Sequence, residues 1–314
     1  MSPTINAPLE TYLLAQLAEP IACLVCEEEN SSNAERCCRC TTPIALARQA
    51  APSKRFGASH RPPHLIAVIG APGAGKTVYL GMLMDMLVRG VGGLRATLRG
   101  ALSIDIQQAA TTPLSCGMYP EKTSIDPEHW RWSHCRIECS RQRQNNRRRA
   151  TEIIVADIAG DAWVEETNHP GCRPAIPGLL QRASAVMVLA DAQRLHGGDH
   201  SDNFTTLKLL STMEEHREPH SRWRRPAKPP LAVVLTKGDG CQTVLDDPTG
   251  FAEAHAEAML RDCQARLPNT RVFGASVAGA SAWRKAAGRR RNVPLRVEPQ
   301  GVVEPLGWLL TQLN

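Results

Sequence analysis

The segment Gly70–Thr77, with the sequence GAPGAGKT, constrains the fold of this chain more than any other feature. It fits the pattern GxxxxGK followed by Ser or Thr at every fixed position. The apolar run Leu65–Ile69 precedes it, and an apolar segment with helical periodicity follows it. Glycines allow backbone N–H groups to curl around a phosphate, and a helix N-terminus adds positive partial charge. The segment therefore predicts a phosphate-binding loop between a strand and a helix.

This loop carries groups suited to a nucleoside triphosphate and its metal ion. Lys76 is expected to reach the β- and γ-phosphates, and the Thr77 hydroxyl is expected to ligate Mg²⁺. The nucleotide-binding residues expected in this loop are Gly70, Gly73, Ala74, Gly75, Lys76 and Thr77.

Beyond His64, short apolar runs alternate with segments of helical periodicity, which is typical of βαβ units. Cys135–Cys139 instead alternates apolar and charged residues, so we expect an edge strand that forms an antiparallel hairpin with Ile153–Ala156. The pattern predicts an α/β three-layer sandwich with a mostly parallel sheet and one antiparallel edge hairpin. The expected strands are Leu65–Ile69, Cys135–Cys139, Ile153–Ala156, Ala185–Ala190, Leu231–Leu235 and Arg271–Phe273, and the expected helices are Lys76–Val88, Asn203–Glu215, Phe251–Leu267 and Val303–Leu313.

Composition divides the chain into a leader (1–20), a cysteine cluster (21–42), a linker rich in Ala, Arg, Ser and Pro (43–63), and the α/β domain (64–314). The sequence is 42% hydrophobic, but no apolar run approaches the roughly 18 residues that a transmembrane helix needs. Residues 1–20 lack the basic region and following apolar stretch of a secretory signal. These features predict a soluble cytoplasmic protein without a membrane span. The net charge of +6 over 314 residues permits anionic partners, but we do not expect nucleic acid to be one.

Four of the eleven cysteines have the spacing of metal ligands. Cys23 and Cys26 form one CxxC pair, and Cys37 and Cys40 form a second pair ten residues later. Four converging thiolates predict a structural zinc site, whose binding free energy of roughly 10–16 kcal/mol could fold so small a segment. The alternatives are a redox pair or unligated thiols.

Two strand ends are candidates for nucleotide contacts. Asp157 ends the run Ile153–Ala156, where its carboxylate could hold Mg²⁺ through water, and Gly160 leaves its N–H free for the γ-phosphate. The alternative is an ordinary turn or helix cap. Farther on, Asp239 could accept two hydrogen bonds from guanine, and the Lys237 stem could lie along the base.

Adenine has no matching pair of donors, so Thr236-Lys237-Gly238-Asp239 predicts a preference for guanine. If these residues form only a surface turn, an ATPase remains the alternative. Ser276 follows another short strand, in the sequence FGAS, where a backbone N–H could contact the guanine carbonyl.

The order of four motifs along the chain resembles that of the TRAFAC class of P-loop GTPases: GAPGAGKT, then DIAG, then TKGD, then FGAS. The chain is more closely similar to a bacterial double-GTPase-like family, on the stretch Gly70–Leu80, the preceding cysteine cluster and the terminal apolar segment Glu304–Leu310. The resemblance implies binding of GTP or GDP with Mg²⁺, with zinc in the N-terminal knuckle. It also implies an effector partner in a bacterial conflict or defence-like system. The stretch around Asn30 resembles the Ran-binding-protein type of zinc finger, although Ile21 stands where that family has Trp.

GTPases of this class use a threonine in a mobile loop to sense Mg²⁺ and the γ-phosphate. We expect Thr123 in this role, with Thr111 and Thr112 as alternatives. Asp161 stands where many GTPases place a water-orienting Gln, and an anion there repels the γ-phosphate. Asp161 could itself orient the water, but hydrolysis is expected to be slow or to need a partner.

The basic tracts Arg147–Arg149 and Arg289–Arg291 could supply an arginine within the chain, or could be solvated surface. Two functions remain open. One is a GTPase switch that acts on an effector protein. The other is a GTP-holding adaptor that does not hydrolyse GTP and docks through its zinc knuckle. The sequence leaves the effector and the oligomeric state unspecified.

Overall fold

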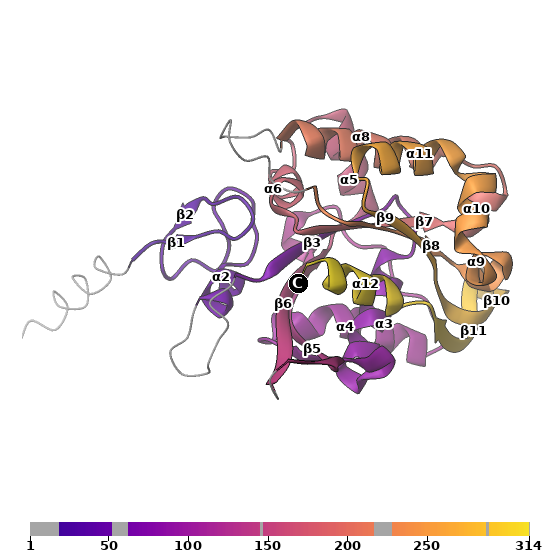
Figure 1. Ribbon diagram of the computed structural model, residues 1–314, viewed down its shortest axis with the longest axis horizontal. Helices are drawn as coiled ribbons and strands as arrows, with labels where there is room; N and C mark the ends of the chain where they lie inside the picture. The colour runs from indigo at the N-terminus through magenta and orange to yellow at the C-terminus, as the bar shows by residue number, and fades with distance from the viewer. Residues whose placement is uncertain (1–18, 52–61, 145–146, 217–227, 287–288, 314) are drawn as a thin grey trace, which may run out of the picture.

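A seven-stranded sheet forms the centre of the larger part of the molecule (Figure 1), in the order β4-β5-β6-β3-β7-β8-β9. The computed structural model describes residues 19–51, 62–144, 147–216, 228–286 and 289–313. From β6 to β9 the neighbouring strands are parallel, and β4 and β5 pair antiparallel. The strands are β3 (His64–Ile69), β4 (Leu94–Leu98), β5 (Arg131–Gln144), β6 (Arg147–Asp157), β7 (Ala185–Asp191), β8 (Leu231–Thr236) and β9 (Thr270–Gly274).

Helices cover both faces of this sheet, as continuous apolar strands require. Every residue of β7 and of β8 is buried. Alternate residues of β3 point to opposite faces: Leu65 and Ile69 enter one core, and Ile66 and Val68 enter the other. One face carries α3 (Lys76–Arg89), α4 (Leu102–Ser115) and α12 (Glu304–Gln312), and the other carries α5 (Gly160–Asn168), α6 (Ala175–Arg182), α8 (Ser201–His216), α10 (Pro248–His255) and α11 (Glu257–Arg266).

This arrangement confirms the expected three-layer sandwich with a mostly parallel sheet and an antiparallel hairpin, β5–β6. The outermost position belongs to β4 rather than to the strand containing Cys135–Cys139, so the expectation that this strand forms the sheet edge was wrong. β4 is only five residues long, and its buried Leu94 and Ala96 alternate with exposed Arg95. An alternating pattern this short did not predict a strand from the sequence.

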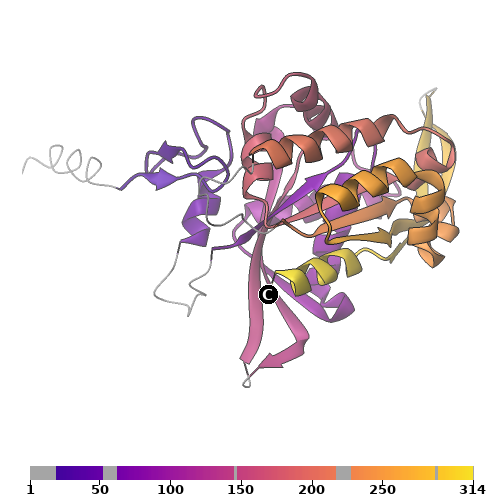
Figure 2. The ribbon, with the colours of Figure 1, turned by 45° about the horizontal axis from the view of Figure 1, so that its top comes forward.

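Two other elements differ from the expectations. The segment expected as one helix, Phe251–Leu267, lies in α10 and α11, which are separated at Ala256, where φ is −146°. A second hairpin was not expected: β10 (Ser276–Ala286) and β11 (Arg289–Gln300) form a separate two-stranded sheet. Figure 2 shows this ribbon on the side of the domain away from the N-terminal module. Short helices α7 (Ala192–His196) and α9 (Thr243–Asp246) follow β7 and β8.

The N-terminal module consists of β1 (Ile21–Ala22), β2 (Glu29–Asn30), the cysteine cluster and α2 (Ile44–Ala50). Helix α2 lies in the part of the chain expected to be a linker, 43–63. It forms there because its Ile44 and Leu46 are buried in the same core as Leu65. The expected leader lies outside the described residues apart from its last two. Within the described ranges, no helix combines the length and apolar character needed to cross a membrane.

Candidate functional site

A cavity of 570 Å³ opens where the carboxyl ends of the parallel strands meet. The phosphate-loop segment lines one part of it, and residues 119–123 line another. The segment after β8 and the start of β10 complete its wall. The predicted phosphate, metal and base-binding segments therefore surround one space.

The phosphate-loop backbone has the conformation that its glycines allow. Gly73 and Gly75 have φ values of +83° and +82°, and Gly75 caps the N-terminus of α3. Lys76 is buried, and its Nζ donates hydrogen bonds to the carbonyls of Gly70, at 2.6 Å, and Ala71, at 3.2 Å. The predicted loop residues are therefore gathered around the N-terminus of α3, with the lysine ammonium held inside the loop.

Three oxygen-bearing side chains meet beside this loop. Thr77 Oγ1 lies 3.0 Å from Asp157 Oδ2 and 2.9 Å from Thr123 Oγ1, and Thr123 Oγ1 lies 3.2 Å from the same carboxylate oxygen. Asp157 is completely buried, and Arg131 Nη1 lies 3.3 Å from its Oδ2. Hydroxyl and carboxylate oxygens are the hard ligands that Mg²⁺ prefers, so this donor set fits that ion.

The structure also separates the three candidate sensor threonines. Thr123 is joined to Thr77 and Asp157, whereas Thr111 and Thr112 lie within α4. The Thr111 hydroxyl donates to the Gln107 carbonyl within that helix. Of the three candidates, only Thr123 makes a described contact with the predicted metal ligands.

Gly160 lies against the phosphate loop, with no room for a side chain. A Cβ at this position would lie 2.4 Å from the backbone nitrogen of Pro72, a separation that would force the backbone to move. The next residue, Asp161, is half-exposed and pairs with Lys122, with 2.6 Å between Nζ and Oδ2. The segment after β6 therefore contacts the phosphate loop through Gly160 and the Thr123 loop through Asp161.

At the other end of the cavity, the segment Thr236–Asp239 follows β8. The Thr236 hydroxyl donates to the Ala74 carbonyl at 2.8 Å, which ties this strand end to the phosphate loop. Lys237 has a positive φ of 61°, and its Nζ lies 2.5 Å from the buried carboxylate of Asp191. Asp239 accepts hydrogen bonds from Ser276 and from Ser281.

Several residues at this site were not anticipated from the sequence. Asp191 ends β7, and its position at a strand end after an apolar run was a signal that could have identified it. Arg131, Tyr119 and Ser281 had no such local signal. Burial raises the pKa of Tyr119, an effect that the hydrogen bond with Ser281 partly offsets and the nearby Asp239 charge reinforces, so its phenol stays protonated at neutral pH.

Among the described residues, neither arginine tract lines the cavity, although Asn292, the residue after Arg291, does. Arg147–Arg149 begin β6, about 26–33 Å of strand from Asp157 at its other end. The backbone of Arg289 pairs with that of Ala286 at the outer end of the β10–β11 hairpin, where Arg290 lies over the Trp283 ring. The side chains of Arg147–Arg149 and Arg289 lie outside the described part.

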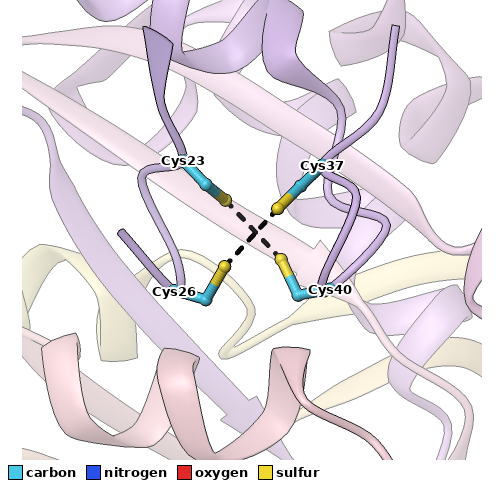
Figure 3. A group of neighbouring side chains, drawn as sticks. All are labelled: Cys23, Cys26, Cys37 and Cys40. Carbon is cyan, nitrogen blue, oxygen red and sulfur yellow. Dashed lines mark hydrogen bonds between the residues drawn. The ribbon is translucent and has the colours of Figure 1, made fainter. Parts of the chain in front are cut away.

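Four of the five cysteines of the N-terminal module, Cys23, Cys26, Cys37 and Cys40, point toward a common centre (Figure 3). The sulfur atoms of Cys23 and Cys40 are 3.5 Å apart, as are those of Cys26 and Cys37, and all four lie within 4.8 Å of one another. Tetrahedral zinc–thiolate bonds of about 2.3 Å place sulfurs about 3.8 Å apart, so the quartet fits zinc.

The thiols of the quartet are shifted in different directions, and burial raises the pKa of Cys26 to about 11. The hydrogen bond from Cys40 lowers the pKa of Cys23 to about 5, and the same coupling raises the pKa of Cys40. Asn30 is buried and donates to the Cys37 sulfur at 3.6 Å, while its side-chain oxygen accepts from the Cys38 N–H at 2.8 Å. Asn30 thereby holds the second CxxC turn.

This chain matches one known protein family and is similar to several solved structures. The model of a family described as Double-GTPase 2 matches residues 64–293. A search of curated proteins finds no match. Similar solved structures include the signal recognition particle receptor SRb-GTP/SRX complex from Chaetomium thermophilum, with 14% identity and a TM-score of 0.38 over 70% of this chain and 94% of that chain.

Two further structures are similar at the same level. Nucleolar GTP-binding protein 1 from Plasmodium falciparum has 11% identity and a TM-score of 0.35, over 82% of this chain and 90% of its own. Roco2 RocCORdC bound to GDP, from Methanosarcina barkeri, has 12% identity and a TM-score of 0.33, over 80% of this chain and 48% of its own.

Proposed function

This chain belongs to the Double-GTPase 2 family, and we propose that it is a Mg²⁺-dependent molecular switch that hydrolyses GTP slowly and acts on an effector protein. Family membership makes it a GTP-binding protein of the P-loop GTPase type. The switching role, the slow hydrolysis and the effector are the proposal. The bacterial conflict or defence-like setting of that effector rests only on the sequence resemblance described above.

The observation that carries the proposal is the meeting of Thr123 with Thr77 and Asp157. Thr77 lies in the first turn of α3 and Asp157 ends β6, so both have fixed positions, whereas Thr123 belongs to a connection between α4 and β5. Thr77 and Asp157, with Thr123, would hold Mg²⁺. When bound, Mg²⁺ neutralises charge on the phosphate oxygens. Because Thr123 lies in a loop and contacts both of these ligands, the loop can change conformation with the presence of the γ-phosphate. Such a change is what the switch proposal requires.

The guanine preference is supported by the position of Asp239. Its carboxylate lines the cavity, and its two serine contacts leave acceptor capacity for two donors of a base. Guanine offers a ring N–H and an exocyclic amine in adjacent positions, and adenine does not. A site built around such a contact discriminates by roughly 10⁴–10⁵ against a ligand that lacks the donors.

Slow hydrolysis is supported by the surroundings of Asp161. This carboxylate pairs with Lys122, and it occupies the position where a glutamine would orient water. An arginine supplied by a partner contributes roughly 10³–10⁵ in rate in other GTPases. A switch with this arrangement would stay in its GTP state until a partner completes the site.

The adaptor function is the second candidate, favoured by the missing glutamine and by the N-terminal module. Val25 is buried against the domain, and its carbonyl oxygen would lie 2.7 Å from a Cβ at position 178 in α6. Arg36 Nη2 donates to the Glu128 carbonyl at 2.7 Å. A module fixed in this way could present a docking surface whose position relative to the nucleotide is set. An ATPase is the third and weakest candidate.

Binding and turnover separate these functions. Purified protein is titrated with fluorescent GTP and ATP analogues in Mg²⁺, and phosphate release from the preferred nucleotide is then followed over many turnovers. GTP preference with sustained release supports the switch. GTP preference without release supports the adaptor, and preference for ATP contradicts both. An activating partner is sought by repeating the release assay with proteins encoded beside this one.

A further inference from the structure

Asp239, the residue proposed to bind guanine, accepts hydrogen bonds from two serines of β10. Only one of these serines belongs to the FGAS sequence. Ser276 Oγ lies 3.2 Å from Asp239 Oδ1, and Ser281 Oγ lies 3.3 Å from Oδ2. Successive side chains of a regular strand alternate between its faces, so residues five apart point in opposite directions. Three register irregularities between Ser276 and Ser281 change this pattern and bring both hydroxyls to one carboxylate.

The two serines differ in the acceptors available to their single hydroxyl protons. Ser276 Oγ lies 2.7 Å from the Ala278 carbonyl, which is closer than Asp239. One proton cannot serve both acceptors fully. Ser281 Oγ has two described polar neighbours, Asp239 and the Tyr119 hydroxyl, and the hydroxyl carries a proton of its own. When Tyr119 donates that proton to Ser281, the Ser281 proton is available to the carboxylate.

A third hydroxyl fixes the direction of this arrangement. Tyr119 Oη lies 2.6 Å from Ser281 Oγ. An ionised Asp239 can only accept, so both contacts are satisfied together only when Ser281 donates to Asp239 and Tyr119 donates to Ser281. The result is a directed chain of hydrogen bonds, from Tyr119 through Ser281 to Asp239. Tyr119 lies four residues before Thr123, in the same loop.

We propose that Ser281 is the principal positioning residue for guanine recognition, and that Tyr119 links this recognition to the loop that carries Thr123. An ionised carboxylate has about four acceptor sites, so Asp239 can keep both serines while it accepts two donors from guanine. Ser281 orients the carboxylate toward those donors. The Tyr119 contact joins the base end of the cavity to its metal end. This inference rests on the proposed reading of guanine by Asp239.

The experiment compares GTP with inosine triphosphate, whose base keeps the ring N–H and lacks the exocyclic amine. Affinities are measured for the wild type and for Ser281→Ala, Ser276→Ala and Tyr119→Phe. We expect Ser281→Ala to weaken GTP binding about tenfold and inosine triphosphate binding less, so that the ratio of the two affinities falls. Ser276→Ala should weaken GTP binding only about threefold, because its proton is shared. A cavity damaged by misfolding would weaken both nucleotides equally.

Two further variants test the chain itself. Ser281→Thr keeps the hydroxyl and should restore the affinity ratio to that of the wild type. Tyr119→Phe should weaken GTP binding, and adding it to Ser281→Ala should cause no further loss, because both changes break the same chain. Ser211→Ala, in α8, is the matched serine control, since its hydroxyl bonds to the Leu207 carbonyl. Hydrogen exchange of residues 117–126 should be slower in the GTP-bound wild type than in the free wild type. With GTP bound, it should be faster in Ser281→Ala and in Tyr119→Phe than in the wild type.

The outcomes separate this inference from the proposed function. If the wild type prefers GTP to ATP but Ser281→Ala binds GTP within twofold of the wild type, the inference alone fails. It also fails if Ser276→Ala has the larger effect, or if the losses from Tyr119→Phe and Ser281→Ala add. If the wild type shows no preference for GTP over ATP, both the inference and the guanine preference are overturned.

Discussion

The ammonium nitrogen of Lys122 lies 2.6 Å from a carboxylate oxygen of Asp161. This pair joins the residue before Thr123 to the residue after Gly160, so the two segments expected to respond to the γ-phosphate contact each other. The Lys122 side chain is 65% exposed and that of Asp161 is 37% exposed. An ion pair this exposed to solvent contributes at most about 1 kcal/mol to the stability of the contact. A bound nucleotide could therefore separate the segments at low cost.

Replacing Asp161 by Gln should accelerate hydrolysis. The change removes an anion expected near the γ-phosphate and supplies an amide that can orient water. We expect phosphate release in a single turnover to rise about tenfold, equivalent to about 1.4 kcal/mol of barrier. Lys122→Ala breaks the same ion pair but keeps the carboxylate, so it should change the rate by less than twofold. An Asp161→Gln rate at or below that of the wild type would show that the carboxylate assists hydrolysis.

Replacing Lys76 by Ala should remove most nucleotide affinity. The buried ammonium is directed into the phosphate loop, where it would meet the β- and γ-phosphates. Loss of charge-assisted hydrogen bonds at about 1.5–3 kcal/mol each predicts at least about a hundredfold weaker GTP binding. Fluorescent titration measures this change, with Lys208→Ala on the exposed surface of α8 as the control. Unchanged affinity in Lys76→Ala would rule out the phosphate-loop interpretation.

Replacing Asp239 by Asn should reduce the preference for GTP over ATP. An amide has one acceptor oxygen and no charge, so the paired contact with the guanine donors is lost. We expect GTP affinity to fall about a hundredfold and ATP affinity to change little. Competition between the two nucleotides measures the ratio. Asp246→Asn, whose side chain bonds to Gln242 on the surface of α9, should leave that ratio unchanged.

The N-terminal module should bind one equivalent of zinc and unfold without it. Cys37→Ser replaces one sulfur of the quartet, while Cys38→Ser replaces an exposed neighbour outside it. Metal analysis should find about one zinc per chain in the wild type and in Cys38→Ser, and much less in Cys37→Ser. Hydrogen exchange of residues 21–42 should accelerate in Cys37→Ser, because the two CxxC turns are then no longer joined by the metal. Absence of zinc from the purified wild type would disprove this site.

Stability should fall as the pH drops below about 6.5, because of His134. Burial lowers the pKa of this histidine, an effect partly offset by Glu152 and reinforced by Arg99. The unfolded chain therefore takes up the proton at a higher pH than the folded chain. Below the unfolded pKa, His134 should reduce the free energy of unfolding by at most about 1.4 kcal/mol per pH unit.

Chemical denaturation at pH 5.0 to 7.5 measures this dependence. His134→Gln should flatten it, whereas His129→Gln, at an exposed position, should leave it unchanged. The same histidine also contacts the N-terminal module, since His134 Nδ1 lies 3.3 Å from Gln49 Oε1 of α2. Equal slopes in the wild type and in His134→Gln would contradict the prediction.

Most of the fold could be predicted, because its central strands are continuous apolar runs. Such runs are stable only when helices cover both faces, so the layers follow from the strands. The edge was harder to predict. β4 has only five residues, and its place beyond β5 depends on pairing with Cys135 and its neighbours rather than on its own composition. The break at Ala256 likewise has no strong helix-breaking residue in the sequence.

The sequence by itself determined the chemistry that is carried by short contiguous segments. In GAPGAGKT and in each CxxC turn, the residues lie close together along the chain, so local backbone geometry sets their positions. Only the tertiary structure decided which distant groups meet these segments. Thr123 joins Thr77 because a loop returns to the sheet, and Ser281 reaches Asp239 because irregularities in β10 reverse the direction of its side chain. Such contacts depend on packing and strand register, and no periodicity of a single segment encodes them.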